Sequence, residues 1–180
     1  MKKLLVMLTA LVCLSANALD RAKFAEQADH VTPLLNGQSV PNVTLKTAQG
    51  DPVSLRALTM QKPTVFLFYR GGWCPYCNLQ LAGLKDIEQQ LVELGYQVLA
   101  ISPDSPARLQ EQKLETEFAV QLLSDDRLDT IRSFGIGFYM PADLEKRYED
   151  KMKISLAKDK QSGRAVLPAP AVFIADQSGK

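Results

Sequence analysis

Cys74 and Cys77 are the two residues of this sequence whose type and spacing most directly indicate chemistry. They form a C-x-x-C pair at the end of the run Arg70-Gly71-Gly72-Trp73-Cys74-Pro75-Tyr76-Cys77. Two thiols three residues apart on a helix lie about one turn apart, which is close enough for a disulfide. The pair therefore predicts reversible dithiol and disulfide chemistry, with the Cys74–Cys77 disulfide as the redox group and no separate cofactor.

Three other interpretations of the pair are weaker. A structural disulfide across so short a loop would constrain the unfolded chain little and would add little stability. A metal site needs more soft ligands, and the chain offers only Cys13 and His30 besides the pair. Two inert buried thiols fit poorly with the flanking glycines and a helix start. We therefore expect a redox function and no metal site.

The flanking sequence would place the pair at a helix N-terminus. Residues 64–69 form a continuous apolar run of strand length, which predicts a buried strand. Apolar residues at 77–94 recur every three or four positions, and Gly95 follows, which predicts an amphipathic helix. Cys74 would then lie in the first turn, where free N–H groups and the helix dipole stabilise a thiolate. Pro75 fits there because it lacks an N–H.

Three neighbours of the pair have roles that the pattern leaves open. Arg70 carries a positive charge that could stabilise a thiolate or attract an anionic or polar substrate, but it could equally face solvent. Trp73 and Tyr76 are either contact groups for a partner protein or side chains that pack on the helix.

The rest of the chain predicts strands that alternate with helices. Apolar or alternating runs predict strands at 42–46, 53–55, 96–102, 120–123 and 171–175. Capping residues and helical spacing predict helices at 20–30 with Asp20 as N-cap, 106–118, 125–134 and 141–156. This alternation is typical of βαβ units and of a mostly parallel sheet in an α/β domain.

Residues 1–18 have the pattern of a signal peptide. A basic start is followed by an apolar run at 4–14 and by Ala16-Asn17-Ala18, a small-x-small cleavage site. The run is shorter than the roughly 20 apolar residues that span a bilayer. We expect cleavage after Ala18 and an exported, periplasmic or secreted protein in which residues 19–180 form one domain without a membrane span. An oxidising compartment suits a redox-active pair.

The composition is that of one nearly neutral globular domain. Of the 180 residues, 46% are hydrophobic and 23% are charged, which is enough for a real core. The formal net charge of +1 gives no electrostatic basis for a nucleic-acid partner. The single histidine argues against a catalytic triad of the serine-protease or papain type.

The order of several motifs resembles that of a known family. Residues 68–81, 100–105 and 122–125 are similar to peroxiredoxin-like proteins of the alkyl hydroperoxide reductase and thiol-specific antioxidant (redoxin) group, which have the thioredoxin fold. The likeness runs from about Val40 to Lys180, and residues 138–167 interrupt it as an expected helical insertion. It implies antioxidant or oxidoreductase activity and a central mixed, mostly parallel sheet flanked by helices, with an N-terminal β-hairpin extension.

Family members normally continue beyond a turn such as 176–179 into an edge strand and a final helix. The sequence ends at Lys180 without them. We therefore expect one face of the sheet to be partly uncovered.

The resemblance implies two alternative roles for the cysteines. With Phe68-Tyr69 aligned, Cys77 falls on the peroxidatic position, Cys74 on the family's threonine and Arg70 on its proline. A thiol peroxidase would oxidise Cys77 to a sulfenic acid, and Cys74 would condense with it. Thioredoxin-like reductases instead attack with the first cysteine and resolve with the second.

Two features near the last strand favour the reductase roles. The active-site arginine that peroxiredoxins usually have there is absent from residues 166–180, and Pro170 matches the cis-proline that faces the C-x-x-C of thioredoxin-like oxidoreductases. We therefore expect a thiol-disulfide oxidoreductase with Cys74 as nucleophile and Cys77 as resolving residue. A thiol peroxidase is the alternative, and a non-catalytic binding module is a third. The expected partners are a protein or small-molecule disulfide or hydroperoxide and an external thiol reductant.

Overall fold

The computed structural model of the chain describes residues 21–115 and 120–180. The expected signal peptide at 1–18, the predicted N-cap Asp20 and the predicted helix end near Phe118 lie outside the described residues.

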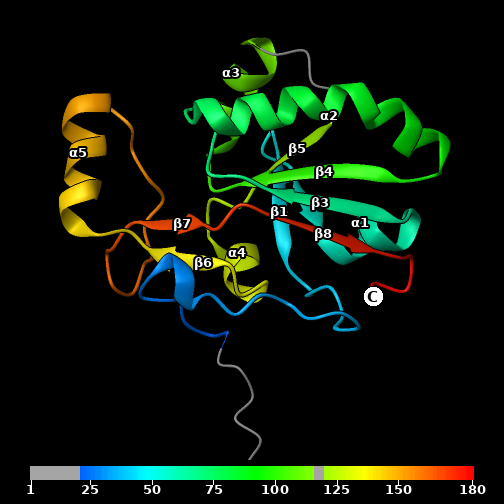
Figure 1. The fold of residues 1–180 in the computed structure, drawn as a ribbon, viewed down its shortest axis with the longest axis horizontal. Helices are drawn as coiled ribbons and strands as arrows, with labels where there is room; N and C mark the ends of the chain where they lie inside the picture. Colours follow the sequence, from blue (N-terminus) through cyan, green and yellow to red (C-terminus); the bar gives the residue numbers. More distant parts are fainter. Residues whose placement is uncertain (1–20, 116–119) are drawn as a thin grey trace, which may run out of the picture.

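Six strands form the main sheet, in the order β2-β1-β5-β4-β3-β8 (Figure 1). Their bounds are β1 (Thr44–Thr47), β2 (Pro52–Ser54), β3 (Thr64–Phe68), β4 (Gln97–Ser102), β5 (Gln121–Ser124) and β8 (Ala171–Ala175). The central strands β5, β4 and β3 are parallel, whereas β1 is antiparallel to β2 and β5, and β8 is antiparallel to β3. The expected α/β class and the N-terminal hairpin are confirmed, and the parallel part is the centre of the sheet.

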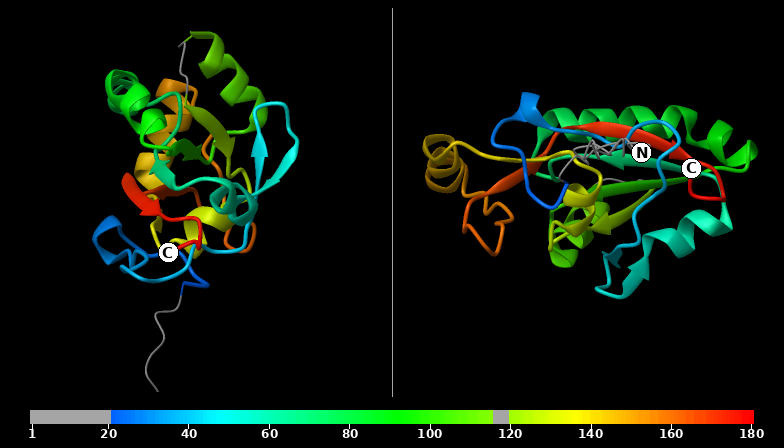
Figure 2. Two further views of the ribbon diagram at one scale, coloured as in Figure 1. Left: turned by 90° about the vertical axis from the view of Figure 1, so that its right-hand side faces the viewer. Right: turned by 90° about the horizontal axis from the view of Figure 1, so that it is seen from below.

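Helices cover both faces of this sheet (Figure 2). Their bounds are α1 (Leu55–Gln61), α2 (Pro75–Glu93), α3 (Pro106–Glu115), α4 (Asp129–Ser133) and α5 (Ala142–Met152). Side chains of α2 and α3, among them Leu81 and Leu109, are buried with Val65 on one face. Phe134, next to α4, packs on the other face, where its ring centroid lies 4.8 Å from that of Phe68. Successive residues of β3 thus point their side chains into the two apolar cores on opposite faces of the sheet.

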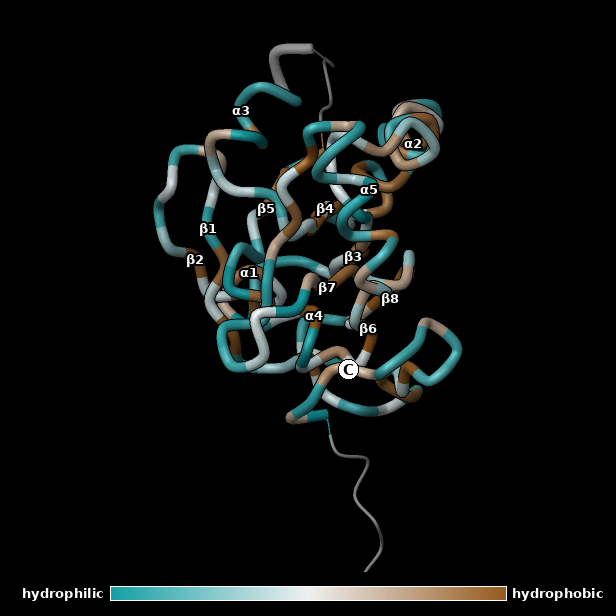
Figure 3. Tube along the Cα trace, turned by 90° about the vertical axis from the view of Figure 1, so that its left-hand side faces the viewer, coloured by the Kyte–Doolittle hydropathy of each residue, from teal (hydrophilic) through white to brown (hydrophobic). Residues whose placement is uncertain are grey.

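Residues 137–168 form a smaller unit at the end of the sheet where α2 begins (Figure 1). β6 (Gly137–Tyr139) pairs antiparallel with β7 (Val166–Pro168), and α5 lies between them in the chain. Phe138, Met140 and Leu167 are part of its separate apolar cluster. The helix α5 itself is mostly hydrophilic (Figure 3), and none of its residues is buried. The unit therefore presents a polar helix beside the start of α2.

The strand β8 forms one edge of the sheet and is partly uncovered. Its Phe173 packs inward, with its ring centroid 5.8 Å from that of Phe68. Val172 and Ile174 alternate with it and are 54% and 65% exposed. These two side chains form an exposed apolar pair on β8.

The prediction of a helix at 20–30 is wrong for the described residues. Only Ala28–His30 form a 3-10 turn, and the chain before it runs alongside β6 through a bridge between Ala25 and Phe138. The reason is Phe24, which is buried in the main core and packs edge-to-face on a tyrosine of β6. Tertiary burial of this ring outweighs the local helical pattern.

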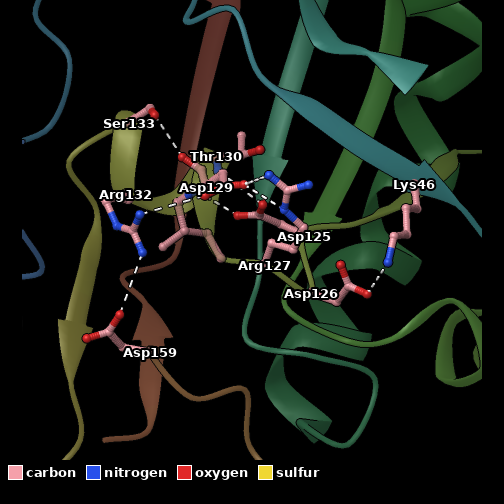
Figure 4. A network of polar contacts seen from close by, with 10 residues as sticks. Lys46, Asp125, Asp126, Arg127, Asp129, Thr130, Arg132, Ser133 and Asp159 are labelled. Atoms are coloured by element: carbon pink, nitrogen blue, oxygen red, sulfur yellow. Dashed lines mark hydrogen bonds and ion pairs between the residues drawn. The ribbon is translucent and has the colours of Figure 1, made fainter. Parts of the chain in front are cut away.

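The turn between β5 and α4 contains a fully buried carboxylate (Figure 4). Asp125 accepts hydrogen bonds from the backbone N–H groups of Thr130 (3.0 Å) and Ile131 (2.8 Å), the first turn of α4. Burial raises the pKa of Asp125 to about 7, although both hydrogen bonds act to lower it. Around it, Arg132 bridges Asp129 and Asp159 at 3.7 Å each. The carboxylate of Asp125 thus fixes the start of α4.

This buried carboxyl makes the stability of the fold depend on pH. The folded protein binds the proton of Asp125 more tightly than the unfolded chain does, because the pKa rises from 3.8 to about 7 on folding. The contribution is present below pH ~4 and is lost as the pH rises through ~7, by at most about 4 kcal/mol. Asp125→Asn mimics the protonated carboxyl, so we expect a flatter pH profile of unfolding free energy in urea. Parallel profiles for the two proteins would contradict this.

Candidate active site

Both cysteines lie where β3 leads into α2, as the sequence predicts. Cys74 is the N-cap residue of α2, and Cys77 lies in its first turn. Both are free thiols, only 7% and 5% exposed, and their Sγ atoms are 2.7 Å apart. The pair can therefore close a disulfide with a small movement. Pro75 occupies the first helical position, as expected.

Gly71 gives the loop before the pair its shape. Its φ is +143°, a conformation that other residues rarely adopt. A Cβ atom at this position would lie 2.5 Å from Nε1 of Trp73 and 2.9 Å from Oδ1 of Asp104. Only glycine allows the tryptophan and the aspartate to approach the loop backbone on the way to Cys74.

We expect Gly71→Ala to destabilise the fold by about 1–3 kcal/mol, because the new methyl group adds steric overlap to backbone strain. The expected sign is a lower midpoint of unfolding together with a changed fluorescence of Trp73, the single tryptophan. Gly83→Ala is the matched control, since Gly83 lies on α2 with open space around it. That change should stabilise the helix by up to about 1 kcal/mol. Equal effects of the two substitutions would show that the loop has no such constraint.

A chain of side-chain hydrogen bonds ties this loop to two helices. The Tyr69 hydroxyl donates to Oε1 of Gln112 on α3 (3.0 Å), and Gln112 donates to Oδ1 of Asn78 on α2 (3.3 Å). Asn78 in turn donates to the carbonyl of Gly72 (2.8 Å). Gln112 was not predicted from the sequence as a residue of the site. The signal was a glutamine three positions after the buried Leu109, at a place where the helical pattern requires a buried residue.

Asp104 holds the other side of the loop. Its Oδ2 accepts the backbone N–H of Gly72 (2.7 Å), and its own carbonyl accepts the hydroxyl of Ser124 (2.6 Å). Burial raises the pKa of Asp104, although the hydrogen bond from the N–H of Gly72 lowers it. The end of β4 therefore fixes the loop that leads to Cys74, another link that the sequence pattern did not reveal.

The surroundings of Cys77 oppose its ionisation. Burial is the main cause that raises the pKa of Cys77 to about 11, and the hydrogen bond to the neighbouring Cys74 thiol adds to it. The backbone N–H of Arg70 bonds to Cys77, and this bond and the arginine's positive charge both lower the pKa. Formation of a thiolate at Cys77 therefore depends on Arg70 and on the protonation state of Cys74.

The three neighbours of the pair have distinct environments. Arg70 is partly buried and lines a pocket beside the loop, and its Nε is buried without a hydrogen-bond partner. Trp73 packs edge-to-face on Tyr148 of α5, with ring centroids 5.3 Å apart. Tyr76 is 84% exposed. Trp73 is thus a packed side chain rather than a free contact group, and it packs on α5 instead of α2. Tyr76 is an exposed group beside the cysteines.

The expectation of a cis peptide bond at Pro170 is wrong. The bond before Pro170 is trans, and the residue is exposed immediately before the edge strand β8. A trans proline fits there because the first residue of a strand needs no N–H partner. The feature that linked this segment to thioredoxin-like reductases therefore does not hold.

Within residues 21–115 and 120–180, no three residues among histidines, cysteines, aspartates and glutamates lie together in a way that could hold a metal ion. No helix in the same ranges is long and apolar enough to cross a membrane.

Comparison with known proteins decides the family. The model of the AhpC/TSA family matches residues 36–180, which include both cysteines and the whole sheet. The chain belongs to the AhpC/TSA family. Among curated relatives, peroxiredoxin Bcp of Escherichia coli is 31% identical over 106 residues, 59% of this chain and 67% of that protein. Chloroplastic peroxiredoxin Q of Oryza sativa subsp. japonica is 32% identical over 108 residues, 60% of this chain and 48% of that protein.

Solved structures support the same fold for this AhpC/TSA protein. Peroxidoxin BcpB of Mycobacterium tuberculosis matches with a TM-score of 0.65 at 20% identity, over 84% of this chain and 82% of that one. Peroxiredoxin Q of Xanthomonas campestris gives 0.60 at 17% identity, over 83% and 82%. The thioredoxin-like fold is thus confirmed. The protein is a thiol-based oxidoreductase, and its relatives favour the peroxidase hypothesis over disulfide exchange.

Proposed function

We propose that this protein is a thiol-dependent hydroperoxide reductase in which Cys77 is peroxidatic and Cys74 is resolving. The Cys77 thiolate attacks one peroxide oxygen, the O–O bond breaks, and water or an alcohol leaves after taking up a proton. The resulting sulfenic acid is attacked by the Cys74 thiolate, which forms the disulfide and releases water. An external thiol then reduces the disulfide and completes the cycle.

One observation carries this proposal. The AhpC/TSA match covers the cysteine pair, and a second thiol lies 2.7 Å from the sulfur of Cys77. Cys77 is the residue that takes the peroxidatic position when Phe68-Tyr69 is aligned with the family motif. The second thiol, Cys74, takes the place of the family's threonine. A sulfenic acid at Cys77 would therefore have its resolving partner in contact, without the rearrangement that a distant cysteine would require.

Arg70 supplies the positive charge that the reaction needs. The end of the chain lacks the usual arginine at 166–180, but the backbone N–H and the charge of Arg70 both favour the thiolate of Cys77. The position of Cys77 in the first turn of the 19-residue helix α2 adds the positive end of the helix dipole. These groups also stabilise the negative charge that develops on the departing oxygen nearby.

Consumption of hydrogen peroxide in the presence of dithiothreitol tests the proposal. The purified protein should consume peroxide catalytically, with many turnovers per molecule, and the double variant Cys74→Ser/Cys77→Ser should show only the background rate. Catalytic consumption by the double variant, or none by the wild type, would refute the proposed reaction.

Disulfide exchange remains a second candidate because of one observation. Cys74 is the N-cap residue of α2, whereas burial and the neighbouring thiol raise the pKa of Cys77 to about 11. These conditions favour Cys74 as the first nucleophile in attack on an external disulfide. In that case Cys77→Ser should accumulate a mixed disulfide on Cys74 during insulin reduction, and peroxide consumption should be slow.

We further propose that the protein acts outside the cytoplasm. The basic start, the apolar run and the small-x-small site of residues 1–18 support export. Expression of the full chain in a bacterium, followed by fractionation and N-terminal sequencing, should recover a mature form that begins at Leu19 in the periplasm or medium. Recovery of uncleaved protein in the cytoplasm alone would contradict it.

A further inference from the structure

A pocket of about 660 Å³ lies beside the loop that carries the cysteines. Its wall combines that loop with residues between 103 and 108, at the start of α3, and with residues 152–157, at the end of α5 and just after it. Its volume is in the range of small-molecule sites, roughly 300–1,000 Å³. The small unit around α5 thus encloses a space that the main sheet and its helices would leave open.

The charges around this pocket leave positive charge without a partner. Among its acidic residues, Asp126 pairs with Lys46 at 2.6 Å, and Asp104 accepts the N–H of Gly72. In the part of the chain that the structure describes, neither Arg70 nor Lys153 forms an ion pair, and Nε of Arg70 is buried without a hydrogen-bond partner. A buried guanidinium nitrogen without an acceptor is costly. Because Arg70 lines the pocket, an anion bound there would give its guanidinium a charged partner.

Part of the wall is apolar. Trp73, Met152, Ile154 and Leu156 line the same pocket. A ligand that fits must therefore combine a short organic body with a negative charge. A carboxylate on a small amphipathic molecule would give Arg70 and Lys153 a negatively charged partner. Carboxylates also match the geometry of a guanidinium.

Two residues of the pocket wall are linked directly to the reacting cysteines. Trp73 is bonded directly to Cys74, and the backbone N–H of Arg70 bonds to Cys77. The same arginine therefore contacts Cys77 through its backbone and lines the pocket with its side chain. Neither cysteine lines the pocket itself, so a molecule held there has to extend past Trp73 to reach Sγ of Cys74.

We propose that this pocket binds the external reductant, and that this reductant is a small thiol that carries a carboxylate. The inference rests on the proposed function, because it concerns the step that reduces the Cys74–Cys77 disulfide. The carboxylate binds Arg70 and Lys153, and the organic body packs against Trp73.

The reduction balances as two thiol-disulfide exchanges. The thiolate of the bound reductant attacks Sγ of Cys74, the Cys74–Cys77 bond breaks, and Cys77 leaves as a thiolate that is then protonated. A second molecule of the reductant attacks the mixed disulfide on Cys74, which releases the dithiol enzyme and the reductant's disulfide. The N–H and the charge of Arg70 stabilise the departing Cys77 thiolate and so offset part of the burial that raises its pKa.

The test uses two thiols that differ in charge and otherwise match. The disulfide form is prepared with diamide, without peroxide, and its reduction by N-acetylcysteine and by N-acetylcysteine amide is followed through the fluorescence of Trp73. Rate constants are expressed per thiolate and divided by those for an uncharged model disulfide, so that differences in thiol pKa and in intrinsic nucleophilicity between the two reagents cancel. For the wild type we expect the acid to react about tenfold faster than the amide, which corresponds to one charge-assisted hydrogen bond.

Three variants assign this preference to the pocket. Arg70→Gln and Lys153→Asn should each reduce the ratio of acid to amide toward one; asparagine suits Lys153, whose φ is +55°. The ratio is the readout because a loss of leaving-group stabilisation at Cys77 slows both thiols alike. Lys151→Gln is the control, since it removes one exposed charge of α5 outside the pocket and should leave the ratio unchanged.

The outcomes separate this inference from the proposed function. A wild-type ratio near one, or a preference that survives both pocket variants, would overturn the inference. A preference lost equally in the Lys151 variant would overturn it too, because the cause would be net charge. None of these results depends on oxidation by peroxide, so failure of the peroxidase reaction would appear only in the peroxide assay.

Discussion

Replacement of Cys77 by serine should slow the oxidation of this protein by hydrogen peroxide at least about a thousandfold, because the change removes the attacking sulfur. Cys74→Ser should instead retain one rapid oxidation per molecule and then stop. The sulfenic acid on Cys77 would have no partner, although the two native sulfurs are 2.7 Å apart. Rapid mixing with peroxide, trapping with dimedone and intact-mass measurement distinguish the two variants.

Cys74→Thr is the sharpest control for this experiment. It restores the residue that the family pattern has at this position and keeps a side chain of similar size at the N-cap of α2. We expect dimedone to label Cys77 in this variant and no internal disulfide to form. Rapid oxidation of Cys77→Ser, with loss of oxidation in both Cys74 variants, would reverse the roles of the two thiols.

The rate of peroxide oxidation should rise steeply with pH. Burial and the Cys74 thiol raise the pKa of Cys77 to about 11, so most of this residue is protonated at neutral pH. Below that pKa, the thiolate fraction increases about tenfold per pH unit. Between pH 7 and 9 we therefore expect an increase of about a hundredfold, measured by stopped-flow at constant ionic strength.

The Cys74→Thr variant also tests how much the neighbouring thiol contributes to the raised pKa of Cys77. Cys74→Thr removes the neighbouring thiol that raises the pKa of Cys77, and a hydroxyl in its place can donate to the thiolate. The pH profile of this variant should bend at a lower pH than that of the wild type, and titration of thiolate absorbance should give the same midpoint. A profile that is flat above pH 7 in the wild type would contradict a raised pKa of Cys77.

The sequence predicted the elements that have strong patterns of their own. The apolar run at 64–69 became β3, the run at 171–175 became β8, and the helical spacing after Cys77 became most of α2. Each is long or apolar enough for its local pattern to agree with its place in the core. The two cysteines were found in the same way, because their spacing and their helix start are both local features.

Elements that depend on distant contacts were missed or misjudged. The strands β6 and β7 have three residues each and pair across the α5 segment, so neither has a pattern that stands out. The segment around Phe24 looked helical, but burial of its ring keeps it extended beside β6. The helix α1 was also missed, although Ser54 caps it through the N–H of Ala57. A serine after a short strand was the available signal.

The same limit applies to the candidate site. Arg70, Trp73 and Tyr76 were identified from their proximity in sequence, but their environments depend on α5 and on the pocket it helps to enclose. Gln112 and Asp104 come from other elements and reach the loop only through the fold. Contacts between segments that are distant in sequence cannot be inferred from one sequence without a topology.

The most direct test of a Cys77-based peroxidase is the rate at which the reduced protein reacts with hydrogen peroxide. Trp73 adjoins Cys74 and is the single tryptophan, so its fluorescence in a stopped-flow instrument should report oxidation of the pair. The account predicts one second-order phase with a rate constant, per Cys77 thiolate, at least about a hundredfold above that of free cysteine thiolate. Formation of one internal disulfide should follow. A rate no faster than that of an ordinary thiolate would contradict the account and leave disulfide exchange led by Cys74.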